Sequence, residues 1–114
     1  MGDVYASGSW HVRSGHDDEF MKRWLAVIEW GRTAHPDGFE RARLLCEDAS
    51  PSHFVSLLEW DSSEARHAWR EDAALPERMR ALAELCDDTH TGAYSEAVRV
   101  GSSESLGESQ GAAT

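Results

Sequence analysis

Residues 53–60 constrain the fold of this chain more than any other segment, because they alternate like a strand and are apolar on both faces. The two faces consist of Phe54, Ser56, Leu58 and Trp60 on one side and of Val55 and Leu57 on the other. A strand of this kind belongs to a sheet that is covered on both faces. The helices of one short chain cover only one face of a small sheet, so the second face needs another cover.

The first half of the chain has clear periods. Residues 4–13 alternate between small or apolar and more polar side chains, which predicts a strand. After the break at Ser14-Gly15, an amphipathic helix is predicted up to the turn residues Pro36-Asp37-Gly38. Its apolar stripe comprises Phe20, Trp24, Val27 and Ile28, joined by Met21 and Leu25. Residues 39–47 form a second extended run, and turn residues at 48–52 predict an antiparallel hairpin with residues 53–60.

The second half is expected to form two helical segments and a last strand. Asp61 is the expected N-cap, and Glu64 would complete a capping box in a helix that runs to about Asp72. A weak joint follows at 73–75, and Pro76 suits the first position of the next segment. That segment has an apolar stripe of Met79, Leu82, Ala83 and Cys86. Asp87-Asp88 would close it before a strand at 91–100.

The predicted order is therefore β-α-β-β-α-β, the split arrangement of ferredoxin-like α+β folds. One domain is expected over residues 1–100, and the small, polar composition of residues 101–114 predicts a disordered tail. With the helices on one face, the bare face with Val55 and Leu57 predicts a homodimer, in which a second copy supplies the missing cover.

The composition excludes several classes of partner. Acidic residues outnumber basic ones 21 to 11 and give a net charge of −10, which disfavours nucleic acids and anionic membrane surfaces. No apolar run approaches the ~18 residues of a membrane span, so a cytoplasmic protein is expected. The two cysteines are interpreted as reduced thiols. The histidines have no zinc-like spacing and there is no glycine-rich phosphate loop, so no metal or nucleotide cofactor is expected.

Five tryptophans stand out in a chain of 114 residues. They occupy positions 10, 24, 30, 60 and 69. A tryptophan brings a large apolar area and one N–H donor, which suits a core, an interface or a pocket for a flat ligand. Composition alone leaves these three uses open.

The order and spacing of short motifs resemble the antibiotic biosynthesis monooxygenase family over nearly all of the chain except the tail. The motifs are Val12-Arg13-Ser14-Gly15, Asp18-Glu19-Phe20, Pro36-Asp37-Gly38-Phe39, Arg41-Ala42-Arg43-Leu44-Leu45, Pro51, the run from Phe54 to Trp60, and Glu64-Ala65. The resemblance implies a dimeric α+β barrel with a pocket between sheet and helices. It specifies the fold better than the activity, because one fold hosts several chemistries.

One branch of this family, the anthrone oxygenases of aromatic polyketide pathways, implies a cofactor-independent monooxygenase of secondary metabolism that combines a flat aromatic substrate with dioxygen. Trp60 matches that branch's tryptophan and Arg80 its arginine. Ser56 and Arg66 stand where the branch has Asn and Tyr. The resemblance thus implies Trp60, Arg80 and Ser56 as catalytic residues.

Such a site needs a flat apolar clamp and a donor or cation for an oxyanion. Trp60 and Trp69 could clamp the substrate, Arg80 could stabilise the anion, and His67 or His11 could take the proton. The other candidate substrate contacts are Arg66, Trp24 and Met79.

Two alternatives remain open. The heme-degrading branch has a Trp that Trp69 matches, but Gly8 and Met79 stand where that branch has an Asn and the iron-binding His, which disfavours heme. A polyketide cyclase-like or non-catalytic aromatic-binding protein of the same fold fits the tryptophans equally well. Oxygen consumption would discriminate, because a cyclase or a binder uses no dioxygen.

Overall fold

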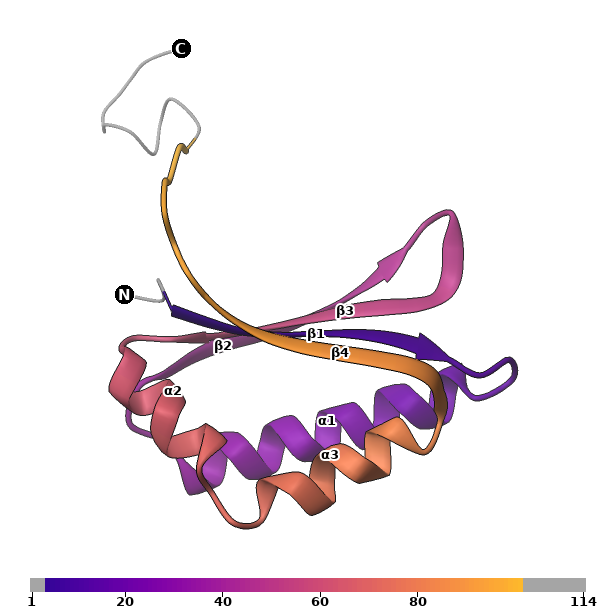
Figure 1. Cartoon of the computed structure of the whole chain (residues 1–114), viewed down its shortest axis with the longest axis horizontal. Coiled ribbons are helices and arrows are strands. Elements are labelled where there is room, and N and C mark those ends of the chain that lie inside the picture. The colour runs from indigo at the N-terminus through magenta and orange to yellow at the C-terminus, as the bar shows by residue number, and fades with distance from the viewer. Residues whose placement is uncertain (1–3, 102–114) are drawn as a thin grey trace.

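The computed structural model describes residues 4–101 and consists of an antiparallel sheet with helices packed against one face (Figure 1). The elements are β1 (Val4–Val12), α1 (Asp17–Ala34), β2 (Phe39–Glu47), β3 (Ser50–Trp60), α2 (Ser63–Arg70), α3 (Leu75–Ala83) and β4 (Cys86–Ser95). The four strands lie in the order β2-β3-β1-β4. The ferredoxin-like α+β fold predicted from the sequence is therefore confirmed.

The described residues cover most of the predicted domain at 1–100. Of the predicted tail at 101–114, all but Gly101 lies outside the described residues. None of the helices within residues 4–101 is both long enough and apolar enough to cross a membrane.

The core lies between one face of the sheet and the inner sides of the helices. Burial alternates along β1, so that Ala6 and Trp10 face the helices as the period predicted. Four residues of the predicted stripe of α1 are buried, Phe20, Trp24, Val27 and Ile28, whereas Met21 and Leu25 lie exposed at its side. The ring of Phe20 lies 5.7 Å from that of Trp10 and 5.3 Å from that of Phe54. Rings from two neighbouring strands thus hold α1 under the centre of the sheet.

The second helix begins one residue later than predicted. Its N-cap is Ser62 rather than Asp61, because the Ser62 hydroxyl accepts a 3.1 Å hydrogen bond from the Ala65 N–H. The Asp61 N–H instead donates a 2.8 Å hydrogen bond to the carbonyl of Gly38, whose φ of 93° makes the turn into β2. Asp61 therefore follows β3 and is tied to the turn at Gly38 rather than to the helix. The helix also ends at Arg70, before the predicted end near residue 72.

The last strand begins and ends earlier than predicted. β4 starts at Cys86, which pairs with Val12 of β1, so Cys86 is not part of the apolar stripe of α3. Asp87 and Asp88 lie exposed in this edge strand and do not close a helix. Charged side chains are common on edge strands, where they discourage pairing with further chains. The strand ends at Ser95 rather than at residue 100.

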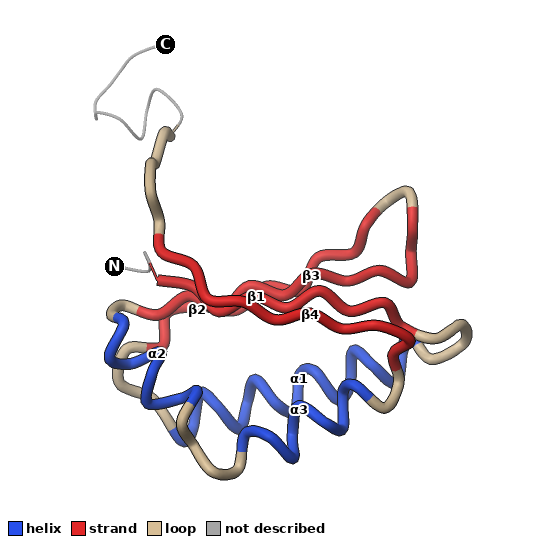
Figure 2. The backbone as a smooth tube through the Cα atoms, in the orientation of Figure 1, coloured by secondary structure: helices blue, strands red, loops and turns tan. Residues whose placement is uncertain are grey.

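The opposite face of the sheet has no described helix on it (Figure 2). Val55 and Leu57 lie there and are only partly buried, and Tyr94 of β4 is 55% exposed. Glu59 is buried on the same face and accepts a 3.1 Å hydrogen bond from Arg43 Nη2. The two apolar faces of β3 predict that both faces of the sheet are covered, but no described part of the chain covers this open face.

Candidate functional site

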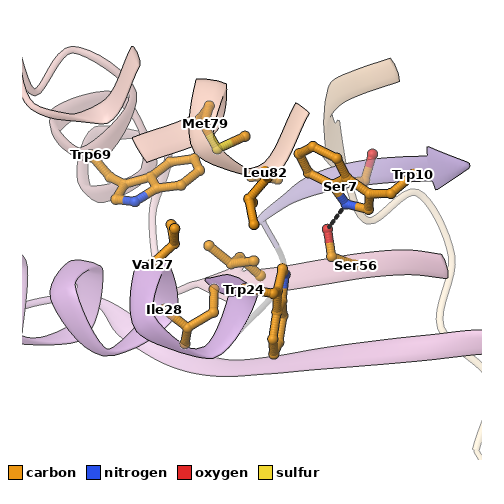
Figure 3. A pocket seen from close by; sticks show the side chains of 11 residues that line it. Ser7, Trp10, Trp24, Val27, Ile28, Ser56, Trp69, Met79 and Leu82 are labelled. Carbon is orange, nitrogen blue, oxygen red and sulfur yellow. Dashed lines mark hydrogen bonds between the residues drawn. The ribbon is translucent and has the colours of Figure 1, made fainter. Parts of the chain in front are cut away.

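A small cavity lies between the sheet and the helices (Figure 3). Its volume of about 30 Å³ is enough for one or two water molecules. The side chains that line it come from two strands and all three helices: Ala6, Ser7, Trp10, Trp24, Val27, Ile28, Ser56, Leu58, Trp69, Met79 and Leu82. None of these side chains is charged, so this inner cavity is an apolar space with hydroxyl and indole groups in its wall.

Trp10 and Ser56 form the polar contact in the wall. Trp10 Nε1 donates a 3.1 Å hydrogen bond to Ser56 Oγ, and both residues are buried (Figure 3). The bond depends on Gly8, which pairs with Ser56 across the strands. A Cβ at Gly8 would lie 2.6 Å from Trp10 Nε1 and 2.8 Å from Ser56 Oγ. The missing side chain of Gly8 therefore leaves the space in which the indole reaches Ser56.

The Ser56 hydroxyl accepts a hydrogen bond but donates none to a described residue. A serine hydroxyl donates one hydrogen bond and accepts up to two. The bond from Trp10 uses an acceptor position, and no described residue accepts the Ser56 proton. Because a buried donor without a partner is unfavourable, this proton is available to an oxygen atom in the inner cavity.

A wider outer cleft of about 200 Å³ adjoins the inner cavity. It is lined by Ala6, Ser7, Trp69, Arg70, Leu75, Met79 and Thr91. Four of these residues also line the inner cavity, and among them Trp69 and Met79 project between the helices and the sheet (Figure 3). The cleft thus leads from the edge of the sheet at β4 to the inner cavity.

The joint between α2 and α3, which the sequence predicted at 73–75, shapes the outer cleft. Asp72 holds it: its Oδ1 accepts a 2.8 Å hydrogen bond from the Ala74 N–H, and its Oδ2 lies 2.8 Å from His35 Nε2 at the end of α1. The backbone hydrogen bond from Ala74 and then that from His35 lower the pKa of the Asp72 carboxyl. The joint is therefore fixed to α1, with Leu75 placed against the cleft.

Trp60 stands behind this site rather than in its wall. It is fully buried and packs between Phe39, at 5.5 Å between ring centroids, and Trp69, at 5.7 Å. Its Nε1 has no hydrogen-bond partner within the described residues. Trp60 lines neither the inner cavity nor the outer cleft, so it reaches the site through Trp69.

Of the other candidates from the sequence, Ser56, Trp24, Trp69 and Met79 come together in the inner cavity. Arg66 and His67 lie on α2 and line a neighbouring surface groove. Arg66 Nη1 donates hydrogen bonds of 2.9 Å and 2.8 Å to the carbonyls of Tyr5 and Tyr94, which fastens α2 to the sheet.

Arg80 lies apart from both cavities. Its side chain is 64% exposed, and its Nη1 donates a hydrogen bond of 2.6 Å to Glu77 on the same helix. Residues 76–83 contribute Met79 and Leu82 to the inner cavity instead. Met79 and Leu82 are three positions apart on α3 and therefore share one side of the helix, whereas Arg80, one position after Met79, points to a different side.

The sequence did not single out several residues that line the site, above all Trp10 and Arg70. Trp10 was one of five tryptophans whose use as core, interface or pocket the composition left open. The signal that could have found it is Gly8, two residues earlier on the same face, because a glycine there leaves room for a large side chain to fold back.

Heme does not fit this site. The indole of Trp10 fills the space into which a side chain at position 8 would project, and the two cavities, at about 30 and 200 Å³, are each smaller than a heme macrocycle. Among residues 4–101, no group of three or more His, Cys, Asp or Glu side chains is arranged to hold a metal ion.

Comparison with protein families identifies the fold independently. A sequence model for the antibiotic biosynthesis monooxygenases matches residues 4–84. No curated protein sequence matches the chain.

Among solved structures, SnoaB, a cofactor-independent oxygenase from Streptomyces nogalater, has a TM-score of 0.73 at 19% identity, with 88% of this chain and 98% of SnoaB covered. A point mutant of SnoaB gives 0.75 at the same identity and coverage. A conserved protein from Methanosarcina mazei Go1 gives 0.70 at 20% identity, with 82% of this chain and 92% of that one covered. At these identities the likeness establishes a shared fold.

Proposed function

The chain belongs to the antibiotic biosynthesis monooxygenase family, and from this premise we propose that it is a cofactor-independent monooxygenase for a flat, anthrone-type phenol. The observation that carries the proposal is the Ser56 hydroxyl, which Trp10 orients in an apolar cavity and whose proton has no acceptor within the described residues. A donor fixed in a dry site stabilises negative charge on a substrate oxygen far better than water does.

The chemistry needs no external reductant. The phenol loses a proton, and the carbon of the resulting enolate forms a bond to dioxygen to give a hydroperoxide. Loss of water then breaks the O–O bond and leaves a carbonyl, so that one oxygen atom enters the product and the other enters water. Ser56 donates its hydrogen bond to the enolate oxygen, and the indole of Trp69 offers a flat face for the ring.

No charged or imidazole side chain lines the inner cavity, so no general base stands in its wall. We therefore infer that the substrate ionises outside the inner cavity or delivers its proton to water. The reaction then suits compounds that are acidic enough to ionise near neutral pH.

The cavity sizes limit how the substrate sits. A dry cavity of about 150 Å³ accommodates benzene. The outer cleft, at about 200 Å³, thus accepts one aromatic ring, while the inner cavity accepts none. A polycyclic substrate requires the two spaces to join, and Met79, a flexible side chain that lies between them, is suited to that movement.

We further propose that a second copy of the chain covers the open face of the sheet. Val55 and Leu57 on that face, together with the exposed Tyr94, form an apolar surface that a soluble monomer rarely leaves open. A twofold dimer brings this same surface from each copy together.

The decisive experiment measures oxygen uptake with a series of anthrones and phenols under 18O2. We expect one labelled oxygen atom in the product, and a lower rate for Ser56→Ala. Ser52→Ala, which changes a serine near the hairpin turn on the same strand, is the matched control and keeps the rate. Absence of oxygen uptake with every compound that binds would reject the oxygenase.

That last result would favour the alternative, a cyclase-like or purely binding protein of this fold. The uncharged wall of the inner cavity supports it, because binding a flat compound requires no proton acceptor. Oxygen uptake separates the two functions, since only the oxygenase consumes dioxygen.

A further inference from the structure

Arg70 differs from most arginines of the chain in its lack of a partner. The arginines that pair with a carboxylate are Arg13, Arg23, Arg32, Arg41, Arg43, Arg80 and Arg99. Arg78 lies over the ring of Trp30 at 4.5 Å, and Arg66 is bound to two backbone carbonyls. Within residues 4–101, Arg70 has no such interaction. Its guanidinium is therefore available to an anionic group of a ligand.

Arg70 lies at the mouth of the cleft. It ends α2, is exposed, and lines both the outer cleft and the neighbouring groove on α2. It is the one charged side chain among the described residues that line the outer cleft. A molecule in the cleft thus meets a single positive charge, at the end that faces solvent.

The surroundings reinforce this positive charge. Arg66 and His67 line the groove beside Arg70, and Glu64 is the acidic residue among its described lining. Arg66 and Arg70 are four residues apart on α2, a spacing at which like charges destabilise a helix. A chain with a net charge of −10 repels anions overall, so a local cluster of this kind is needed wherever an anion is to bind.

We propose that Arg70 binds a carboxylate at the rim of the aromatic substrate, so that the site takes hydroxylated aromatic acids in preference to neutral phenols. The inference rests on the proposed function in that it places the aromatic ring in the outer cleft. The planar guanidinium presents two parallel N–H donors that match the two oxygens of a carboxylate. The carboxylate stays at the solvent edge while the ring lies against Trp69 and Met79.

The test uses isothermal titration calorimetry on the full chain with 1-hydroxy-2-naphthoic acid and with its methyl ester. A hydrogen bond to a charged group is worth enough for the acid to bind about tenfold more tightly than the ester. Arg70→Gln is expected to abolish this preference, and Arg70→Lys to keep part of it. Arg32→Gln removes an exposed arginine of α1 that lines neither cavity and is expected to keep the full preference.

Equal affinity for acid and ester in the unmutated protein overturns the proposal, as does a preference that survives in Arg70→Gln or a failure of the acid to bind. Circular dichroism checks that each variant is folded. The proposed function fails separately: if the acid binds through Arg70 but no oxygen is consumed with any substrate, the binding site stands and the oxygenase does not. If oxygen uptake is instead equally efficient with acid and ester and is unaffected in Arg70→Gln, the oxygenase stands and the Arg70 binding site does not.

Discussion

Trp10 Nε1 lies 3.1 Å from Ser56 Oγ although the backbone pairs Trp10 with Phe54 and Ser56 with Gly8. The indole therefore reaches back along β1, over the glycine, to a residue two pairs away in the register. This diagonal contact joins the two central strands inside the core and sets the direction of the hydroxyl in the cavity wall.

Ser56→Ala removes the acceptor and leaves a buried indole N–H without a partner. A loss of about 1–3 kcal/mol in the free energy of unfolding is expected, measured by urea denaturation. Trp10→Phe combined with Ser56→Ala removes both partners, so the double variant should lose less than the sum of the two single losses. Additive losses would contradict the coupling.

Gly8→Ala places a methyl group 2.6 Å from Trp10 Nε1. The indole has to move, and a loss of about 1–3 kcal/mol in stability is expected from this overpacking. Tryptophan fluorescence should shift as the hydrogen bond to Ser56 breaks. Gly15→Ala is the control. A Cβ there meets no atom within 4 Å, so this variant strains only the backbone φ of 86° and should leave the fluorescence emission unchanged.

Leu82→Ala enlarges the inner cavity, because Leu82 is 1% exposed and lines it. The variant should lose about 2–5 kcal/mol in unfolding free energy. It should also gain affinity for a small apolar probe such as benzene, measured by the rise in melting temperature with added probe. Unchanged binding of benzene would mean that the wall collapses into the space.

Asp72→Asn tests the joint between α2 and α3 through pH. The folded-state pKa of Asp72 is lowered, mainly by the Ala74 N–H and then by His35, so the charged carboxylate stabilises the fold. This stabilisation is fully present above the ordinary pKa of 3.8 and is lost as the pH falls through the lower folded value. The stability gap between wild type and variant, measured by thermal melts, should therefore close below about pH 4.

The control for the joint is Asp48→Asn, an exposed aspartate in the turn between β2 and β3. It should show no comparable gap at neutral pH. A gap for Asp72→Asn that stays constant down to about pH 2, below the ordinary range of a carboxyl pKa, would exclude the charge as its cause.

Leu57→Glu tests the proposed dimer. The substitution puts a charge in the middle of the open face, so sedimentation should detect a monomer in place of a dimer, with the fold retained in circular dichroism. His67→Glu on the exposed side of α2 adds the same charge elsewhere and should keep the dimer. An unmutated chain that sediments as a monomer at micromolar concentration would reject the dimer itself.

The sequence predicts well where the physical cause is local. The alternation of β1 and the stripe of Phe20, Trp24 and Ile28 depend on residues within a few positions, and both were predicted correctly. The contact between Trp10 and Ser56 spans 46 positions and depends on strand register, which no local pattern contains.

The motif order alone does not decide which residues of a helix face a cavity. Arg80 was matched through the family resemblance, whereas in the structure it is exposed and pairs with Glu77, and Met79 and Leu82 line the inner cavity. The prediction that Asp87-Asp88 close a helix was wrong because acidic residues suit a helix boundary and an exposed edge strand equally. Arg70 could not be found at all from the sequence, because its lack of a partner is a property of the folded surface.

The uncharged wall of the inner cavity also bears on how such a protein can diversify. Apolar side chains such as Val27, Ile28 and Leu82 come from the helices, while the Ser56 hydroxyl comes from the sheet. Exchanges on the helices therefore alter the shape of the cavity and leave the polar groups of the strands in place. If Ser56 acts as proposed, a new substrate specificity can evolve by single exchanges on the helices.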